Sequence, residues 1–309
     1  MKYFPLIMLL ISFTAFAIEG GVSLYPPGYL SPQAGIAPSP GSYVGLEFYS
    51  YSGDAEKHTR AGRLYFDSDL EISADIFTYT YAAQAKVWNN GTPFFSVMLP
   101  YTNIEMDGEV TGTFPNLGLV ERHRFEKSTG SLGDSSITAG VGWHRDYFHY
   151  MFLTNVYAPT GDYDKNKFLN VGLNRWGIQP MAAFTYLNEK NGIEVSSALG
   201  YMVNLENTET KYNSGDELNA ELAVIQHFSK AVNLGLIGYA NQQVTGDSGE
   251  GAILGEFKGQ VYGAGLTLGG QAAITEEHDF LFNFRYYNEF NAIHRFEGQS
   301  FYVSGTVDF

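Results

Sequence analysis

The last ten residues of the chain alternate apolar and polar side chains and end on a phenylalanine. Successive side chains of an extended chain point to opposite faces, so this stretch predicts a strand with one apolar and one polar face. The apolar face would carry Phe301, Val303, Gly305, Val307 and Phe309. Such a strand fits a boundary between lipid and water, where it must pair on both sides because unpaired backbone groups in hydrocarbon are costly. The edge strand of a soluble sandwich shows the same alternation and is the alternative.

The chain begins with the features of a secretory signal peptide. Lys2 precedes an apolar run over residues 4–16, and Ala15-Phe16-Ala17 provides the small-residue site expected before cleavage at Ile18. The sequence contains no cysteine, which excludes a lipoprotein anchor, a disulfide framework and a cysteine-based metal site. Beyond residue 17 no run approaches the roughly 18 apolar residues of a membrane-spanning helix. We therefore expect an exported protein without membrane-spanning helices.

The composition combines many aromatic residues with a slightly polar average. There are 23 Phe, 22 Tyr and 35 Gly, yet the mean hydropathy is −0.15. A lipid-embedded protein has such an average when half of each strand faces water, as in a barrel with a wet interior. The formal net charge of −15 argues against nucleic acid as a partner and favours solvated acidic loops.

From residue 43 onward, candidate strands are joined by connections that alternate between short and long. The predicted strands span 43–51, 72–86, 93–106, 133–145, 147–158, 174–187, 192–205, 216–228, 231–244, 256–272, 279–291 and 300–309. Long polar loops, such as 107–132, alternate with short turns, such as 188–191. This pattern is typical of bacterial outer-membrane barrels. We predict an all-β protein, a transmembrane antiparallel up-and-down β-barrel of about twelve strands over residues 43–309, which follows a signal peptide over residues 1–17.

Residues 18–42 are too rich in proline and glycine to form the interior of a strand or helix. They contain Tyr25-Pro26-Pro27-Gly28 and Pro38-Ser39-Pro40-Gly41. We predict an irregular N-terminal segment with two alternatives, a periplasmic lead-in or a short plug folded into the lumen.

Within the predicted strands, apolar and polar residues separate onto two faces. Trp176, Ile178 and Phe184 would face lipid, while Gln179 and Thr185 would face the lumen. Strand phase also places a set of charged and tyrosine side chains in the lumen, and these are the candidate permeation residues: Arg175, Glu194, Glu217, Glu221, Tyr239, Arg285 and Glu289. The inward faces would also present Tyr157, Met181, Tyr262 and Tyr287. Two roles stay open for the charged set, a structural ion-pair network that fills the pore or a constriction that selects solutes.

Two short motifs suggest chemistry and are better explained as loops. Gly246-Asp247-Ser248-Gly249 matches the nucleophile motif of trypsin-like proteases, but Gly-Pro does not follow it and no histidine motif lies upstream. Asp162, Asp164 and Asn166 have the first spacings of a calcium loop, but Lys167 stands where glycine is required. We expect no catalytic residue, no metal site and no cofactor.

The stretch from Asn155 to Asp247 resembles the SphA-like family of outer-membrane proteins associated with the MetA pathway of phenol degradation. The resemblance begins with Asn155-Val156-Tyr157-Ala158-Pro159-Thr160-Gly161-Asp162. It continues through residues 170–176, 192–196, 200–207, 212–215, 226–229 and 245–249. The chain departs from the family at Asn219, where histidine is usual, and at Leu266, where proline is usual.

The resemblance implies an outer-membrane barrel that passes aromatic or other hydrophobic compounds. We therefore predict a passive channel for small hydrophobic or phenol-like solutes, located in the cell outer membrane. The alternatives are a structural or surface-interaction barrel and an outer-membrane hydrolase. Expected partners are the solute, outer-membrane lipid and lipopolysaccharide, and the barrel-assembly machinery, which would recognise Phe309.

Overall fold

The computed structural model describes residues 21–309 except for 60–63, 115–118, 253–254 and 276–277. The predicted signal peptide and its cleavage site lie outside the described residues. Within the described part of the chain every regular element is a β-strand. No helix among these residues is long and apolar enough to cross a membrane.

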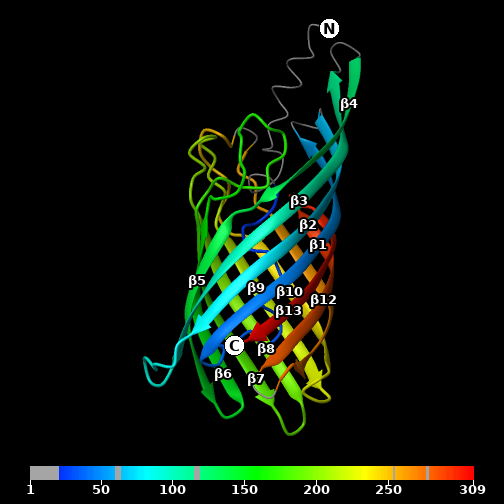
Figure 1. Cartoon of the computed structure of the whole chain (residues 1–309). Coiled ribbons are helices and arrows are strands. Elements are labelled where there is room, and N and C mark those ends of the chain that lie inside the picture. Colours follow the sequence, from blue (N-terminus) through cyan, green and yellow to red (C-terminus); the bar gives the residue numbers. More distant parts are fainter. Residues whose placement is uncertain (1–20, 60–63, 115–118, 253–254, 276–277) are drawn as a thin grey trace.

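The strands follow one another around a closed antiparallel sheet (Figure 1). They are β1 Gly41–Thr59, β2 Leu64–Ala82, β3 Thr92–Phe114, β4 Leu119–Leu132, β5 Ser135–Arg145, β6 Phe148–Ala158, β7 Gly177–Asn188, β8 Ile193–Asn204, β9 Glu217–His227, β10 Asn233–Gln243, β11 Gln260–Ala273, β12 Asp279–Ile293 and β13 Glu297–Asp308. The last strand returns to the first, with a ladder from Tyr43 opposite Asp308 to Asp54 opposite Glu297. The closed sheet leaves no unpaired edge at the seam, as a membrane-spanning sheet requires.

Twelve strands close the barrel, as the sequence predicts, and β4 is an additional strand. One edge of β3 pairs with β2 along its length. The other edge pairs with β5 over Thr92–Met98 and with β4 over Tyr101–Phe114. Because β4 continues the sheet above β5, β1 to β4 rise beyond the rest of the barrel (Figure 1). We call these four strands the tall sector.

The predicted loop over 107–132 is therefore wrong, because β3 continues to Phe114 and β4 fills most of the remainder. Glu105 and Asp107 are exposed, whereas Ile104 and Met106, which alternate with them, are buried. These acidic residues suggest a loop, but they form the water-facing side of a strand that extends beyond the lipid. The predicted first strand, 43–51, likewise stops short, since β1 continues to Thr59.

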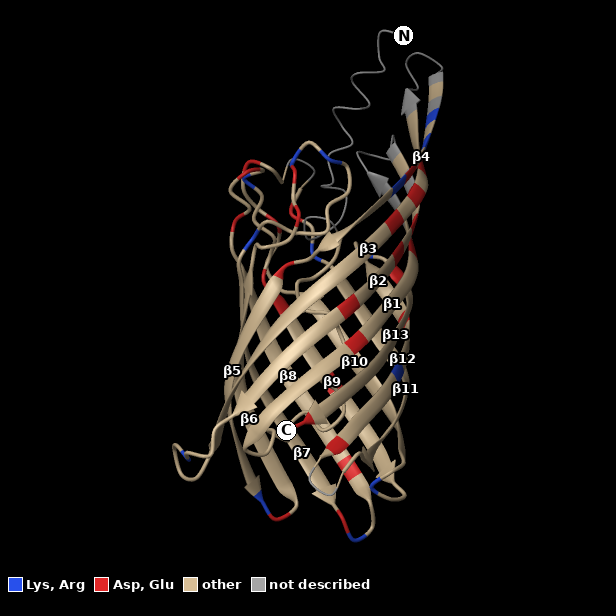
Figure 2. Ribbon diagram, in the orientation of Figure 1, with Lys and Arg blue, Asp and Glu red and all other residues tan. Residues whose placement is uncertain are grey.

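The outer surface of the barrel is apolar across its middle. Phe152, Leu222 and Leu236 are each more than half exposed there, and Trp176 and Ile178 face outward as the alternation predicts. Charged residues gather toward the two ends and along the tall sector (Figure 2). This is the pattern of a lipid-facing barrel.

One predicted inward residue lies on the outer face. Tyr262 stacks on Phe290, which is 48 % exposed, with 6.1 Å between the ring centroids. Tyr262 lies in the same phase as Ala264, Leu266 and Leu268, which are exposed, so the alternation of β11 itself places it outward.

The two ends of the barrel differ. Long connections gather at one end, here the long-loop end, and short turns occupy the other, here the short-turn end (Figure 1). The chain termini of the barrel meet at the short-turn end, where the backbone groups of Ser42 and Phe309 exchange hydrogen bonds of 3.1 and 2.9 Å. Gly192 closes one short turn with φ of 72°, and a Cβ there would lie 2.0 Å from the His227 carbonyl oxygen. Glycine suits this turn because it alone lacks that atom.

Candidate functional site

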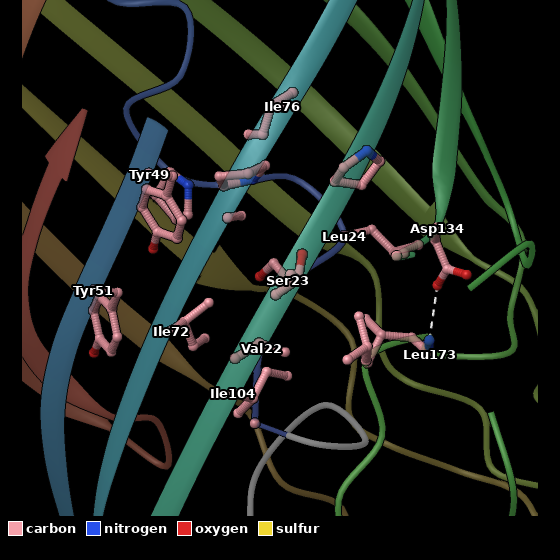
Figure 3. A pocket seen from close by; sticks show the side chains of 18 of the residues that line it. Val22, Ser23, Leu24, Tyr49, Tyr51, Ile72, Ile76, Ile104, Asp134 and Leu173 are labelled. Atoms are coloured by element: carbon pink, nitrogen blue, oxygen red, sulfur yellow. Dashed lines mark hydrogen bonds between the residues drawn. The ribbon is translucent and has the colours of Figure 1, made fainter. Parts of the chain in front are cut away.

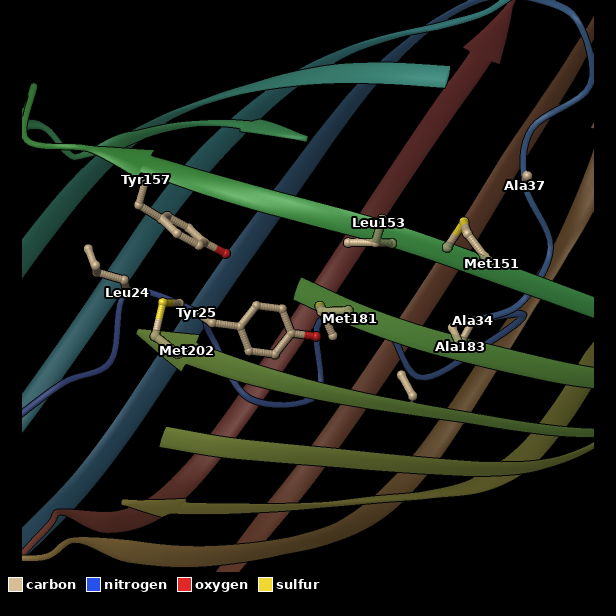
Figure 4. Packing of buried hydrophobic residues seen from close by; sticks show 11 residues of the cluster. Leu24, Tyr25, Ala34, Ala37, Met151, Leu153, Tyr157, Met181, Ala183 and Met202 are labelled. Atoms are coloured by element: carbon tan, nitrogen blue, oxygen red, sulfur yellow. The ribbon is translucent and has the colours of Figure 1, made fainter. Parts of the chain in front are cut away.

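Residues 21–40 lie inside the barrel and extend along its axis (Figure 4). We call them the lumen segment. Toward the short-turn end, Gly35 N donates to Thr185 Oγ1 on β7 at 2.9 Å. At the long-loop end, Ser23 Oγ accepts from Arg295 Nη1 at 2.8 Å. The segment therefore passes through most of the height of the lumen.

The local sequence explains why this segment forms neither strand nor helix. Pro26 and Pro27 supply no backbone N–H, and the following Gly28 has φ of 83°. The Tyr29 N–H closes the turn on the Pro26 carbonyl at 3.3 Å. A Cβ at Gly28 would lie 2.6 Å from the Tyr287 ring, so the close approach of this turn to the barrel wall requires glycine.

Glu221, on β9, holds the middle of the lumen segment. One carboxyl oxygen accepts from the Tyr25 hydroxyl. The other accepts from Ser31 Oγ at 2.7 Å and from Leu30 N at 3.1 Å. The Glu221 side chain is buried, and these donors come from the segment itself, which compensates for the loss of water around the carboxyl group.

Arg285, on β12, holds the turn of the segment at Gly28 and Tyr29. Its guanidinium pairs with the Glu47 carboxylate on β1 and donates to the carbonyls of Gly28, at 3.2 Å, and Tyr29. The guanidinium also lies over the Tyr302 ring, 4.4 Å from its centroid. A planar, permanently charged group suits this position because it can donate to several acceptors at once. Sequence analysis missed Glu47, whose partner is far away in the chain.

Glu194 and Glu217 bind the two ends of the lumen segment. Glu194 accepts from Gln33 N at 2.8 Å and contacts His227 Nε2 at 2.6 Å. Glu217 accepts from the Ser23 hydroxyl and from Asn241 Nδ2, the latter at 2.9 Å. Both carboxyl groups are fully buried.

The other three predicted residues are buried in the interior and bond to residues of the barrel. Glu289 accepts from Tyr51 at 2.8 Å, from Tyr239 at 2.7 Å and from the Gly298 N–H at 2.9 Å. Arg175 donates from Nε to Asn204 Oδ1 at 3.3 Å. All seven predicted residues thus face the interior, and four of them contact the lumen segment.

A cavity of about 170 Å³ remains between the lumen segment and the tall sector (Figure 3). Its wall consists mainly of apolar side chains from β1, β2 and β3: Tyr49, Tyr51, Ile72, Ala74, Ile76, Met98, Pro100 and Ile104. The opposite side is formed by residues 21–24, 26 and 27 of the segment. Glu289 and Arg295 contribute polar groups at its edge. An engineered apolar cavity of roughly 150 Å³ binds benzene, so this space suits one aromatic ring.

The rim of the cavity is tied to the loop between β6 and β7. Asp134 accepts from Leu173 N at 2.7 Å, as Figure 3 shows, and from Gly161 N at 2.9 Å. Burial raises the pKa of the Asp134 carboxyl above its ordinary value, and these N–H donors act against that rise. The Thr-Gly-Asp sequence at 160–162 therefore holds a loop over the cavity.

Most cavity residues were not among the predicted candidates. They are aliphatic or small, and an inward Ile72 or Ala74 carries no sequence signal that separates it from an ordinary core residue. The alternation of the early strands is also less regular than that of β7 to β9, because the outer face of β2 and β3 changes from apolar to acidic above the lipid. If the alternation of inward and outward side chains is followed through residues 43–51, it places Tyr49 and Tyr51 in the lumen.

The family described as "Putative MetA-pathway of phenol degradation" matches residues 53–304. The chain belongs to this family. Its fold is similar to that of the COG4313 outer membrane channel from Pseudomonas putida F1, with 14 % identity and a TM-score of 0.64 over 92 % of this chain and 100 % of that one. The CymD monoaromatic hydrocarbon channel is more distant, with 8 % identity and a TM-score of 0.40 over 87 % and 88 % of the two chains. A search of curated protein sequences gives no match. The fold is that of an outer-membrane barrel.

Proposed function

We propose that this barrel passes small, uncharged aromatic compounds across the outer membrane and performs no chemistry on them. The observation that carries the proposal is the apolar cavity beside the lumen segment, whose volume of about 170 Å³ suits a single ring. Membership of the phenol-degradation family supports an aromatic solute. Similarity to an outer membrane channel supports a path through the barrel.

The charge of the lumen supports an uncharged solute. Glu217, Glu221 and Glu289 are buried carboxyl groups that face the interior, and Arg295 at the cavity edge already donates to Ser23 and Asn241, so an anion there would lose water with little compensation. A passive path also needs weak binding, because the solute must leave as readily as it enters. The apolar cavity wall offers contact area without strong hydrogen bonds.

The seven candidate residues divide between two proposed roles. Glu194, Glu217, Glu221 and Arg285 fix the lumen segment, so we assign them to the positioning of that segment. Tyr239 and Glu289 support the edge of the cavity, and Arg175 supports the loops at the long-loop end. Together they shape the path.

The outer surface suggests the remaining partners. The apolar band contacts outer-membrane lipid, and the acidic tall sector extends to the level of lipopolysaccharide if the long-loop end faces outward. Phe309 is 60 % exposed at the end of the closing strand, where the barrel-assembly machinery would recognise it. These contacts are part of the proposal.

Uptake measurements test the proposal. Cells lacking the protein should take up labelled phenol and toluene more slowly than complemented cells at low solute concentration, while sugar uptake stays unchanged. Glu221→Gln and Arg285→Ala should alter aromatic uptake with the heat-modifiable barrel retained. Equal uptake of aromatic, alkane and sugar solutes with and without the protein would contradict a channel.

The tall sector favours a second candidate, a surface-interaction barrel. Asp54, Asp69 and Asp107 lie opposite one another on three neighbouring strands and are exposed. A surface role would depend on this acidic face and not on the cavity. If the protein acts through this surface, replacement of the three aspartates with asparagine should abolish its surface interaction. If it acts as a channel, the same replacement should leave solute uptake unchanged.

A further inference from the structure

The side chain of Tyr25, which is itself a phenol, occupies part of the lumen. This residue belongs to the lumen segment and is 2 % exposed. Its ring lies among Met181, Met202 and Tyr157 of the barrel wall, beside Leu24 of the segment (Figure 4). Methionine side chains are adaptable and make favourable contacts with aromatic rings, so these wall residues form a pocket suited to a six-membered ring.

The polar end of this pocket is a carboxyl group. The Tyr25 hydroxyl donates to Glu221 Oε1, while Glu221 Oε2 accepts from the Ser31 hydroxyl and from Leu30 N. The two oxygens therefore have separate tasks. Oε2 holds the backbone of the segment, and Oε1 binds the phenolic hydroxyl. Departure of the Tyr25 side chain alone would leave Oε1 as an acceptor at the end of an apolar pocket.

Tyr25 can leave without disruption of the barrel. It lies outside every strand, so its backbone takes no part in the ladders that close the sheet. The groups that surround it, Met181, Met202, Tyr157 and Glu221, come from strands β6 to β9 and stay in place. The pocket is therefore a property of the wall, and Tyr25 is its occupant.

We propose that the pocket around Tyr25 is a binding site for neutral phenols and that a phenolic solute displaces the Tyr25 side chain as it passes. The site deepens the proposed function and rests on it for its physiological role. Leu24 connects the two spaces, because it borders the cavity beside the tall sector and also packs in the cluster around Tyr25. A solute in the cavity is thus separated from the phenol pocket by the segment alone.

Removal of the occupant tests the site directly. Purified barrel with Tyr25→Ala should bind 4-fluorophenol with one site per chain, observed as a shifted ¹⁹F resonance and by calorimetry. The matched control is Tyr25→Phe, which keeps a ring in the pocket and should bind 4-fluorophenol more weakly than Tyr25→Ala, because the ligand must first displace that ring. Heat modifiability on gels confirms the folded barrel in both variants. Tyr25→Val vacates most of the ring volume and provides a second protein if Tyr25→Ala does not fold.

The role of Glu221 is tested by a pair of ligands. In the Tyr25→Ala background, Glu221→Gln should weaken 4-fluorophenol binding by about tenfold, because a hydrogen bond to a charged acceptor is replaced by a weaker one. Binding of 4-fluorotoluene, which has no hydroxyl, should change by less than about twofold on the same substitution. Equal losses for both ligands would overturn the assignment of Oε1 as the phenol acceptor.

The outcomes separate this inference from the proposed function. If neither Tyr25→Ala nor Tyr25→Val binds 4-fluorophenol although the barrel is folded, the phenol site is refuted, and cell uptake still decides the channel. If these variants bind as expected but uptake of phenol does not depend on the protein, the site exists and the channel is refuted.

Discussion

The two walls that face the lumen segment differ in what they offer it. The holding wall, on β7 to β12, presents hydrogen-bonding groups to the segment: Thr185, Glu194, Glu217, Glu221, Arg285 and Tyr287. The cavity wall, on β1 to β3, presents mainly apolar groups and leaves a gap: Tyr49, Ile72, Ala74, Ile76, Met98 and Ile104. The segment is therefore fixed on one side and leaves space on the other.

This difference shows how one lumen can be both filled and permeable. Buried carboxyl and guanidinium groups are costly unless they have partners, so the holding wall keeps the segment in a defined place. The apolar side chains of the cavity wall need no partners, and a solute can contact them without breaking a hydrogen bond. A substitution in either wall, or a deletion of the segment between them, should therefore have a distinct effect.

Deletion of the lumen segment should have the largest effect. A chain lacking residues 21–40 keeps every barrel strand but loses the material between the two walls. Twelve strands enclose a lumen between those of a filled eight-stranded barrel and a water-filled sixteen-stranded porin. Vesicles with the shortened protein should admit sugars that the intact protein excludes, measured as swelling rates. Unchanged exclusion by a heat-modifiable barrel would contradict the assignment of the segment as the filler.

Arg285→Ala should break the holding wall at its strongest point. The substitution leaves the Glu47 carboxylate buried without its partner, and loss of one member of a buried pair costs about 3–5 kcal/mol. Unfolding in urea, followed by tryptophan fluorescence, should show this decrease in the free energy of unfolding. The double substitution Glu47→Met/Arg285→Met removes both charges and should restore most of the loss. A double variant as unstable as Arg285→Ala would argue against the pair as the cause.

Ala74→Phe should alter the cavity wall without touching the holding wall. Ala74 is 5 % exposed and borders the cavity, so a phenyl ring there occupies the space proposed for the solute. Overpacking should cost about 1–3 kcal/mol of stability, and uptake of labelled toluene should fall several-fold. Ala182→Phe places the same ring on the lipid face of β7 and serves as the control. Equal uptake by both variants would exclude the cavity from the path.

Tyr287→Phe should have the smallest effect. Its hydroxyl donates to the Gly28 carbonyl at 3.0 Å and also lies 2.9 Å from Ser31 Oγ, and loss of such a hydrogen bond costs about 0.5–1.5 kcal/mol. Arg285 still holds the same turn, so sugar exclusion in the swelling assay should persist. Tyr81→Phe, on the outer surface, should leave stability unchanged. A Tyr287→Phe barrel that admits sugars would show that Arg285 alone does not hold the segment.

The sequence predicts the barrel well and its tall sector poorly. Alternation in β7 to β9 and β12 is regular because one face meets lipid and the other a polar lumen, so Trp176 and Glu217 fall on their correct faces. In β2 and β3 the outer face changes from apolar to acidic along one strand. Asp107 therefore looks like a loop residue although it belongs to a strand. Local composition does not show where, along the barrel axis, a strand leaves the lipid and enters water.

The candidate site shows a similar limit. Strand phase is a local property, and it places Glu221 and Arg285 in the interior. Their partners depend on long-range contacts: Glu47 is 238 residues from Arg285, and Ser31 is 190 residues from Glu221. Proline and glycine content predicts that residues 18–42 are irregular. It does not predict whether they lie in the lumen or in the periplasm, because both locations accept the same local sequence pattern.

The hydrogen bonds between Ser42 and Phe309 have a consequence for the order of assembly. They join Ser42, which lies just after the lumen segment, to Phe309, so the segment is anchored at the seam where β1 meets β13. This pairing spans nearly the whole chain, and contacts of such large sequence separation carry a high entropic cost of loop closure. The ion pair between Glu47 on β1 and Arg285 on β12 also crosses the seam. A barrel that has not closed cannot bring Glu47 beside Arg285, so the full set of contacts that holds Gly28 depends on closure of the sheet.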